Sequence, residues 1–255
     1  MSKILIFHRQ PLEYFPPVMN FLKFLDHKEL SVEVLSQKNA KNRVDFTTSK
    51  VKLFRVNQSN SASRLESLLV ELRFAIRGLM MALRLKPEVV VYYESTSVLP
   101  VYLYSLFNKK VKIVSINHEY LSKEWYAKTA SFSTRFFHSL EKKRIFRLCK
   151  VIGQTNEQRK NLFLTDHKNK HNEELMLLPN YPLENWTEPI FKTKDSSERK
   201  KLVFVGTSSL KYSYLREMCE FVIANQQSYS LDIFSFNQQK QIQIHLHLSR
   251  YFYEA

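Results

Sequence analysis

The sequence predicts an α/β protein with a parallel, doubly wound, Rossmann-like sheet, followed by an incomplete second Rossmann-like domain. Short apolar runs rich in β-branched residues alternate with longer helical patterns, as in sheets whose strands are buried on both faces and joined by helical crossovers. The same rhythm starts again near residue 201, where too few residues follow to complete another such domain. With 44% hydrophobic and 13% aromatic residues, the chain has enough apolar material for a core.

Seven short segments are expected to form the first sheet, because each is apolar, rich in β-branched residues and bounded by polar or turn residues. In chain order they are Ile4–Phe7, Val32–Leu35, Val51–Val56, Val89–Tyr93, Val111–Ile116, Val151–Ile152 and Leu175–Leu178.

The clearest helix lies between the third and the fourth of these strands. Its apolar residues recur at the i, i+3, i+4 and i+7 spacing that is typical of one helix face. They are Leu65, Leu68, Leu69, Leu72, Ile76, Leu79, Met80 and Leu83. Ser61 or Ser63 is the candidate N-cap, and Pro87 is expected to end the helix.

The composition of the chain changes near residue 180. A turn at Pro179–Pro182 is followed by a polar, charged segment without periodicity. We therefore expect a first domain over 1–180, a linker over 181–200 and a partial second domain over 201–255. The expected elements of the last part are a strand at 201–206, a helix at 214–224 and a strand at 231–234.

Lys and Arg outnumber Asp and Glu by 39 to 24, which gives a formal net charge of +15. A field of this sign attracts polyanions without identifying them. Ser122–Lys150 carries much of the excess among aromatic residues. Two interpretations of it stay open: a solvated helix face over a core stripe, or a surface that docks on acidic lipid headgroups. No recognition motif accompanies the charge, so nucleic acid is not expected as a partner.

The longest apolar run, Val98–Phe107, has about half the length that spans a bilayer. The apolar run at the start of the chain is too short for a signal peptide. Cys149 and Cys219 have no metal-ligand or redox-motif spacing, so reduced thiols are expected. These features predict a cytoplasmic protein, with peripheral attachment to the inner face of the membrane left open.

Several kinds of chemistry are excluded by composition. The chain has only three glycines, and none follows the first strand, where a dinucleotide or P-loop fingerprint would need them. No G-x-S-x-G elbow supports a hydrolase triad. His167 and His171 have the spacing of a zinc pair, but their segment is so polar that a surface turn is expected instead. No cofactor or metal is therefore predicted.

Ionisable residues come directly after the fourth and the fifth of the predicted strands. His118 and Glu119 come directly after the fifth strand, and Glu94 follows the fourth. Ligands of open α/β sheets bind beyond the carboxyl ends of the strands. His118 and Glu119 are therefore candidate catalytic residues, a proton carrier and an acceptor for a sugar hydroxyl. The alternatives are a capping or packing role for His118 and an N-cap role for Glu94.

The turn that begins at Gly206 is the best candidate anion site. Thr207, Ser208 and Lys211 follow it at the entrance to the predicted helix. Backbone N–H groups, hydroxyls and one lysine at such a turn suit a diphosphate. An ordinary strand-to-helix turn remains the alternative.

The order of these pieces resembles the retaining GT-B glycosyltransferases of family 4 and their relatives. The first strand, the strand ending at Tyr93 and the strand ending in His118 are each similar to strands of the family's acceptor domain. The remaining similar segments are Val151–Glu157, the turn Leu178–Asn180 that resembles the interdomain "iPNg" turn, and Leu202–Gly206.

The resemblance implies transfer of a sugar from a nucleoside-diphosphate sugar to a glycan or lipid-linked acceptor, with retention and without a required metal, as in polysaccharide or cell-surface glycan biosynthesis. It places the acceptor on the first domain, with Glu94 and Arg9 in the acceptor cleft, and the nucleotide on the second. His118 would match the histidine beside the reacting sugar. Lys211 would match the basic residue that steadies the leaving diphosphate, together with the turn Gly206–Ser208.

The sequence also departs from the family. The glycine-rich first loop is replaced by His8–Pro17, Thr207 stands where an arginine is common, and no two glutamates are eight residues apart, as the family's donor-domain pair is. We therefore expect a truncated transferase that is weakly active or inactive alone. The alternative is a non-catalytic module that binds a glycan, a glycolipid or a partner transferase.

Overall fold

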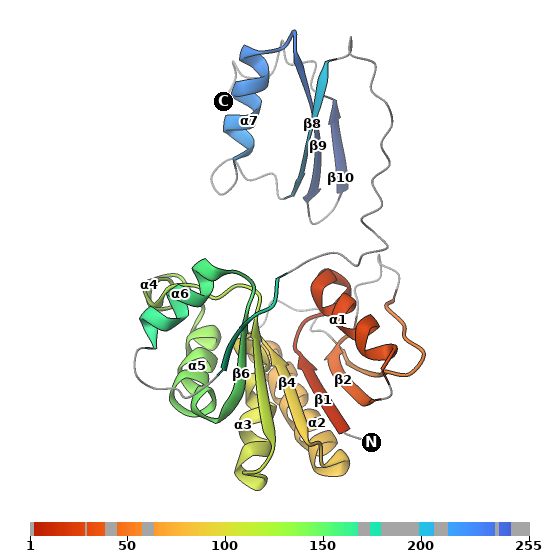
Figure 1. Cartoon of the computed structure of the whole chain (residues 1–255), viewed down its shortest axis with the longest axis vertical. Coiled ribbons are helices and arrows are strands. Elements are labelled where there is room, and N and C mark those ends of the chain that lie inside the picture. The colour runs from red at the N-terminus through yellow and green to blue at the C-terminus, as the bar shows by residue number, and fades with distance from the viewer. Residues whose placement is uncertain are drawn as a thin grey trace. The chain divides into compact units, whose positions relative to one another are not determined.

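The computed structural model describes residues 3–28, 30–38, 45–57, 64–167, 174–179, 199–206, 214–237 and 240–245. The chain divides into two compact units, Met1–Glu188 and Pro189–Ala255, and each unit is described by itself (Figure 1). This division falls within the predicted linker 181–200. Up to residue 198 the linker lies outside the described residues, so its character stays a prediction.

The first unit contains a seven-stranded sheet in which every neighbouring pair of strands is parallel. Its order is β3-β2-β1-β4-β5-β6-β7. The strands are β1 (Lys3–His8), β2 (Ser31–Gln37), β3 (Lys52–Val56), β4 (Val89–Tyr93), β5 (Lys112–Asn117), β6 (Cys149–Gln154) and β7 (Glu174–Leu177). All seven strands expected from the sequence are present, and the predicted fold class is confirmed.

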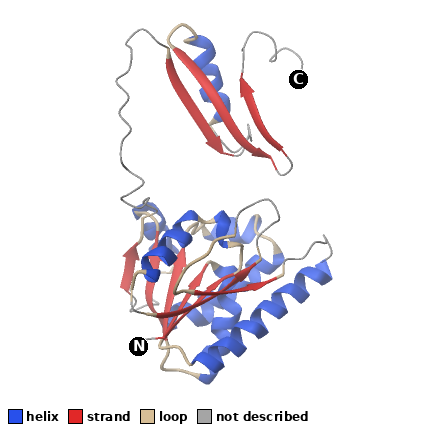
Figure 2. Ribbon diagram, turned by 90° about the vertical axis from the view of Figure 1, so that its right-hand side faces the viewer, coloured by secondary structure: helices blue, strands red, loops and turns tan. Residues whose placement is uncertain are grey.

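Helices cover both faces of this sheet (Figures 1 and 2). They are α1 (Pro16–Asp26), α2 (Arg64–Leu85), α3 (Val98–Phe107), α4 (Lys123–Lys128), α5 (Phe132–Leu140) and α6 (Glu157–Asp166). Short 3-10 turns occupy Leu12–Tyr14, Ser95–Ser97 and Phe146–Leu148, and a π-helical turn occupies Glu141–Ile145.

The alternation of side chains along each strand creates two cores. Leu5 and Phe7 of β1 join one apolar cluster with residues of α2, α3 and α5. Ile6 of β1 joins the other cluster, which contains Val18 and Leu22 of α1. Helices α2, α3 and α5 therefore form one layer on the sheet, and α1 lies on the opposite face.

The buried face of helix α2 is not the one with the regular apolar spacing from which the helix is predicted. Val70, Phe74 and Met81 are buried in the core, together with two alanines. Most of the residues with the regular apolar spacing are instead exposed. These are Leu68, Leu69, Leu72, Ile76, Met80 and Leu83. The helix thus carries apolar side chains on two faces, and the sequence periodicity marks the outer one. The candidate N-caps Ser61 and Ser63 lie outside the described residues.

Close contact between α2 and α3 depends on Gly78. A Cβ atom at this position would lie 2.6 Å from the Cβ of Pro100 in α3, which is closer than two carbon atoms pack. Helix α2 then ends at Leu85, Lys86 adopts a left-handed φ of 49°, and Pro87 follows. Pro87 ends the helix, as the sequence predicts.

The second unit contains a three-stranded sheet of order β10-β9-β8. β8 (Lys200–Gly206) and β9 (Tyr229–Asn237) are parallel and connected through α7 (Leu215–Ala224), so the predicted strand–helix–strand is present. β10 (Lys240–His245), which the sequence does not predict, pairs antiparallel with β9. In the described residues of both units, no helix is long and apolar enough to cross a membrane.

Candidate functional site

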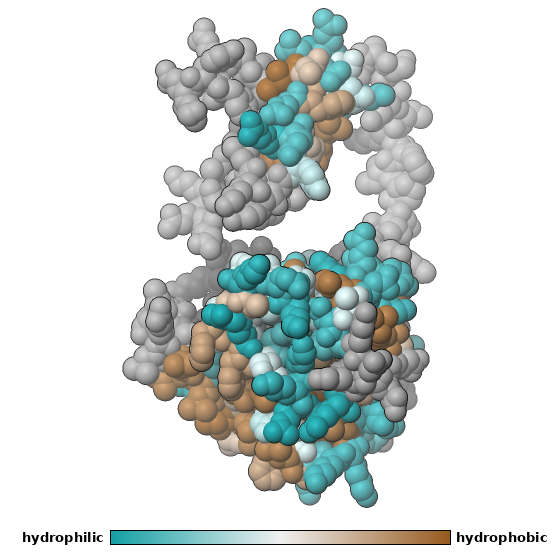
Figure 3. Space-filling model, turned by 90° about the vertical axis from the view of Figure 1, so that its left-hand side faces the viewer, coloured by the Kyte–Doolittle hydropathy of each residue, from teal (hydrophilic) through white to brown (hydrophobic). Residues whose placement is uncertain are grey.

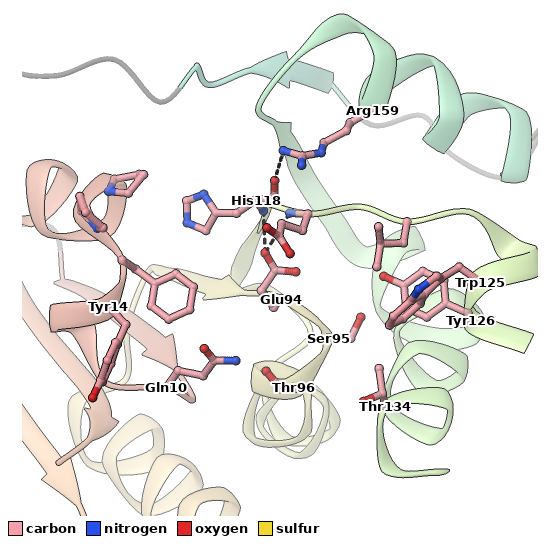
Figure 4. A pocket seen from close by; sticks show the side chains of 15 residues that line it. Gln10, Tyr14, Glu94, Ser95, Thr96, His118, Trp125, Tyr126, Thr134 and Arg159 are labelled. Carbon is pink, nitrogen blue, oxygen red and sulfur yellow. Dashed lines mark hydrogen bonds between the residues drawn. The ribbon is translucent and has the colours of Figure 1, made fainter. Parts of the chain in front are cut away.

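A pocket of about 640 Å³ lies at the carboxyl edge of the first unit's sheet. β1 lies between β2 and β4, so the chain builds the sheet outward from β1 in one direction and from β4 in the other. Such a switch point leaves a crevice beyond the strand ends, where ligands of open α/β sheets bind. The walls come from the loops after β1, β4 and β5 and from the beginnings of α1 and α4, with one residue each from α5 and α6 (Figure 4).

The loop after β1 is shaped by proline. Pro16 and Pro17 also line the pocket and begin α1, where a proline needs no amide donor and its fixed φ suits the helix. The preceding turn presents Gln10, Tyr14 and Phe15 to the pocket. This loop takes the place of a glycine-rich phosphate loop, so the pocket has aromatic and amide groups on this side.

The imidazole of His118 lies in an aromatic stack. Its ring is 5.3 Å from that of Tyr93 at an interplanar angle of 13°, and 6.3 Å from that of Phe15. His8 packs against the same two rings, at centroid distances of 4.7 Å from Phe15 and 5.5 Å from Tyr93. Burial lowers the pKa of His8 to about 4, so this second histidine is neutral at physiological pH. The rings of Tyr93 and Phe15 therefore hold His118 in a fixed orientation, and its neighbour His8 carries no charge.

Glu94 connects the ends of β4 and β5. Its Oε1 accepts the backbone N–H of His118 at 2.6 Å and that of Glu119 at 3.3 Å (Figure 4). Its own backbone has φ 59° and ψ 157°, a region that residues other than glycine rarely occupy. Such strain persists only where surrounding contacts enforce it, and it concentrates at functional sites.

The carboxyl group of Glu94 also titrates unusually. Burial raises its pKa from 4.5 to about 7, and the nearby Glu141 and Glu119 carboxylates add to the rise, while the two backbone N–H donors oppose it. A carboxyl group with a pKa near 7 is present in both protonation states at physiological pH. Glu94 can therefore both accept and donate a proton in the pocket.

Arg159 forms the upper rim of the pocket from the first turn of α6 (Figure 4). Asn156 caps this helix by accepting the N–H of Arg159 at 2.8 Å. The Nη1 of Arg159 donates to the carbonyl of His118 and to Oγ1 of Thr155. The guanidinium thus holds the β5 loop from the side opposite Glu94.

A buried carboxylate supports the pocket from behind. Glu141, in the π-helical turn, accepts hydrogen bonds from the hydroxyls of Tyr92, at 2.8 Å, and of Ser95. His138 Nδ1 lies 3.5 Å from the same carboxylate, and its ring stacks on the pocket residue Tyr126 at 3.7 Å. π-helical turns are rare and recur at functional sites. Glu141 therefore holds Ser95 directly and contacts His138, on which the ring of Tyr126 stacks.

The structure brings together three of the residues singled out from the sequence: Glu94, His118 and Glu119 all line this pocket. Arg9 does not. Its guanidinium donates two hydrogen bonds of 3.0 Å to Glu71 of α2, and the residue is not among those lining the pocket. The roles assigned to these residues stay predictions.

The candidate diphosphate turn belongs to the second unit. Gly206 is the last residue of β8. Thr207, Ser208 and Lys211 lie outside the described residues, so their assignment stays a prediction. In the part of the chain that the structure describes, no group of three or more His, Cys, Asp or Glu side chains could hold a metal ion.

Sequence reasoning missed the aromatic wall of the pocket. Trp125 and Tyr126 of α4 face Gln10 and Tyr14 across it, with Thr96 between them (Figure 4). In the sequence, these aromatics look like part of an amphipathic, basic segment. The available signal was their position in the segment that leaves the carboxyl end of β5, the edge where ligands of open α/β sheets bind.

No protein-family model matches the chain, and no curated protein sequence matches it significantly. Solved structures do. A UDP-GlcNAc 2-epimerase from Neisseria meningitidis, bound to UDP-GlcNAc, matches with a TM-score of 0.51 at 13% identity, over 92% of this chain and 66% of the epimerase. Sucrose-phosphate synthase from Thermosynechococcus elongatus matches with a TM-score of 0.57 at 11% identity, over 95% and 71%. A UGT transferase from Siraitia grosvenorii, in complex with UDP, matches with a TM-score of 0.55 at 12% identity, over 97% and 68%.

At these identities the likeness shows the fold alone. The chain has the Rossmann-like GT-B fold of these glycosyltransferases and epimerases, and it spans about two thirds of the length of the structures it matches.

Proposed function

We propose that the chain takes part in glycosyl transfer from a nucleoside-diphosphate sugar, and that its first unit holds the acceptor. The observation that carries the proposal is the convergence of His118, Glu94 and Glu119 in one pocket at the switch point of the sheet. The GT-B fold supports it, because the similar structures include transferases, and two of those compared were solved with UDP or UDP-GlcNAc.

The lining of the pocket suits a sugar. Trp125, Tyr126 and Tyr14 offer aromatic faces for the C–H surface of a pyranose, and the indole of Trp125 is accessible, since the residue is 36% exposed. Glu94 and Glu119 offer carboxylate oxygens that accept hydrogen bonds from hydroxyls. A few polar groups among aromatic walls are typical of small-molecule sites.

The charge of the pocket favours an uncharged acceptor moiety. Arg159 is the one Lys or Arg among the described residues that line it, and its Nη1 already donates to the β5 loop. The two carboxylates face the same space. The surplus Lys and Arg residues that the structure describes therefore do not line this pocket, and a hydroxyl-rich group fits its lining better than a polyanion.

The chemical roles follow the resemblance to the family 4 enzymes. His118 lies beside the reacting sugar, Glu119 accepts a hydroxyl of the acceptor, and Glu94 holds the loop that carries both. The diphosphate of the donor binds at Gly206, Thr207, Ser208 and Lys211 of the second unit. Transfer proceeds with retention and without a resident metal or cofactor.

We further propose that the acceptor is a glycan or lipid-linked sugar of a cell-surface polysaccharide, reached at the inner face of the membrane through 122–150. Phe132 is 80% exposed, and Phe136 is also exposed, next to the exposed Arg135. Phe137 is buried in the core and is not available for this contact. Exposed aromatics beside basic residues are typical of interfacial helices.

A thermal-shift series with nucleotide sugars tests the proposed function. We expect at least one nucleoside-diphosphate sugar to raise the melting temperature more than its nucleoside monophosphate does, since the diphosphate turn adds binding free energy to the folded state. A result in which no nucleotide sugar stabilises the chain but a free glycan does would replace the proposal by the non-catalytic binding module.

A further inference from the structure

The outer surface of helix α2 is an apolar stripe that no described part of the first unit covers. Leu72, Ile76 and Met80 lie at its centre, and Met80 is 65% exposed. The stripe continues over four helical turns, with Leu68, Leu69 and Leu83 at its ends and edges. A helix that is apolar on two opposite sides is expected to be buried on both. In the first unit only one side of α2 is.

The neighbouring helices extend this surface. Helix α3 packs against both α2 and α5, and the three helices cover the same face of the sheet. Phe107, at the end of α3, is 68% exposed, and Leu106 beside it is also exposed. Part of this surface forms the brown area on the lower left of the first unit in Figure 3. Proteins seldom expose contiguous apolar surface that extends over more than one helix, and such surface marks an interaction site.

Basic residues flank the stripe. Arg73 and Arg77 are exposed on one border of the α2 stripe, and Lys109 and Lys110 follow Phe107. The two acidic residues of α2 do not neutralise this positive charge. Glu71 forms an ion pair with Arg9, so Glu66 is the remaining carboxylate of the helix. Helix α3 contains no acidic residue. The surface therefore complements an anionic partner.

We infer that the layer α2–α3–α5 lies on a bilayer that contains anionic lipids, with the α2 stripe inserted among the headgroups. Leucine, methionine and phenylalanine flanked by Lys and Arg is the composition of helices that lie in the membrane interface. A second copy of this chain fits less well, because each copy carries a net charge of +15. The inference extends to α2 and α3 the membrane contact that is proposed above for 122–150. It rests on that proposal only for the choice of a membrane as the partner.

Vesicle co-sedimentation tests this assignment. Vesicles of phosphatidylcholine with and without phosphatidylglycerol are mixed with the full chain and with the variant Leu72→Gln/Ile76→Gln/Met80→Gln. Glutamine is a good helix former, so the exposed face of α2 keeps its helix. The matched control is Phe24→Gln on α1, since Phe24 and Leu72 are both 52% exposed but lie on opposite faces of the sheet.

We expect binding only to the anionic vesicles, weakened about tenfold or more by the triple substitution and unchanged by Phe24→Gln. A separate variant, Met80→Trp, is expected to show a blue-shifted emission on addition of these vesicles, because residue 80 enters the headgroup region.

Three results would overturn the inference. In the first, the triple variant still binds the vesicles, whereas a variant with Glu in place of Lys142, Lys143, Arg144 and Arg147 does not. The membrane contact would then involve 122–150 but not α2. Absence of vesicle binding by the unmodified chain removes both contacts. A dimer in sedimentation velocity that the triple variant dissociates, without vesicle binding, assigns the stripe to self-association.

Discussion

The carboxylate of Glu94 accepts the backbone N–H of His118 at 2.6 Å, so the first residue after β4 determines where the loop after β5 lies. The strained backbone of Glu94 and the raised pKa of its carboxyl group both occur at this contact. The carboxyl edge of the sheet is thus held together by an ionisable group, which makes the pocket sensitive to pH.

The first prediction concerns the stability of the fold between pH 4.5 and 7. The folded-state pKa of Glu94, about 7, lies above its ordinary value of 4.5, so the folded protein binds this proton more tightly than the unfolded chain does. The resulting stabilisation is fully present below pH 4.5 and is lost as the pH rises through 7. Glu94→Gln is expected to flatten this part of the urea-unfolding profile. Glu124→Gln, at an exposed position of α4, serves as control and should leave the profile unchanged. Equal slopes for Glu94→Gln and the unmodified chain would contradict the assignment.

The second prediction concerns the carboxylate behind the pocket. Glu141→Ala removes the acceptor for Tyr92 and Ser95 and leaves two buried hydroxyls without it. We expect the free energy of unfolding to fall by about 3 kcal/mol, measured by urea denaturation. Glu124→Ala, on the exposed side of α4, should change it by less than about 0.5 kcal/mol. A loss at position 141 as small as at 124 would show that this buried network contributes little.

The third prediction concerns the contact between α2 and α3. Gly78→Ala improves helix propensity by about 1 kcal/mol, but places a Cβ 2.6 Å from Pro100. We expect the clash to prevail and stability to fall by about 1–3 kcal/mol. Pro100→Gly, which removes the clashing Cβ, should relieve part of this cost, which a double-mutant cycle measures. A stabilised Gly78→Ala protein would mean that α2 and α3 are free to separate.

The fourth prediction compares the two units. The second unit has a small apolar cluster and an exposed Val203 in β8, whereas β4 is buried between β1 and β5. Hydrogen exchange should therefore be faster in Leu202–Val205 than in Val89–Tyr93. Equal protection of the two segments would show that the second unit has a more complete core than its described residues form.

Strand content was predictable because the first sheet is parallel and buried on both faces, so its strands appear as continuous apolar runs. The position of His118, Glu119 and Glu94 in one pocket was predictable as well, because neighbouring parallel strands end at the same edge of a sheet. The environment of Arg9 was not, because its partner Glu71 is 62 residues away in sequence. Nor was the outward orientation of the α2 stripe: periodicity shows that a helix has an apolar face, but not whether the core lies against it.

Binding of a sugar acceptor by the pocket at the carboxyl edge can be measured by probing the full chain on an array of immobilised glycans. The same array is probed with Trp125→Ala, which removes an aromatic wall, and with Phe132→Ala, which removes an exposed aromatic outside the pocket lining. Aromatic side chains on which nucleic-acid bases stack contribute about 1–3 kcal/mol per base, and we expect a loss at the lower end of this range for a sugar face. We predict binding to a defined set of uncharged glycans, weakened about tenfold or more by Trp125→Ala and retained by Phe132→Ala. Glycan binding that Trp125→Ala leaves unchanged, or that is confined to acidic polymers and lost at high salt, would contradict the account.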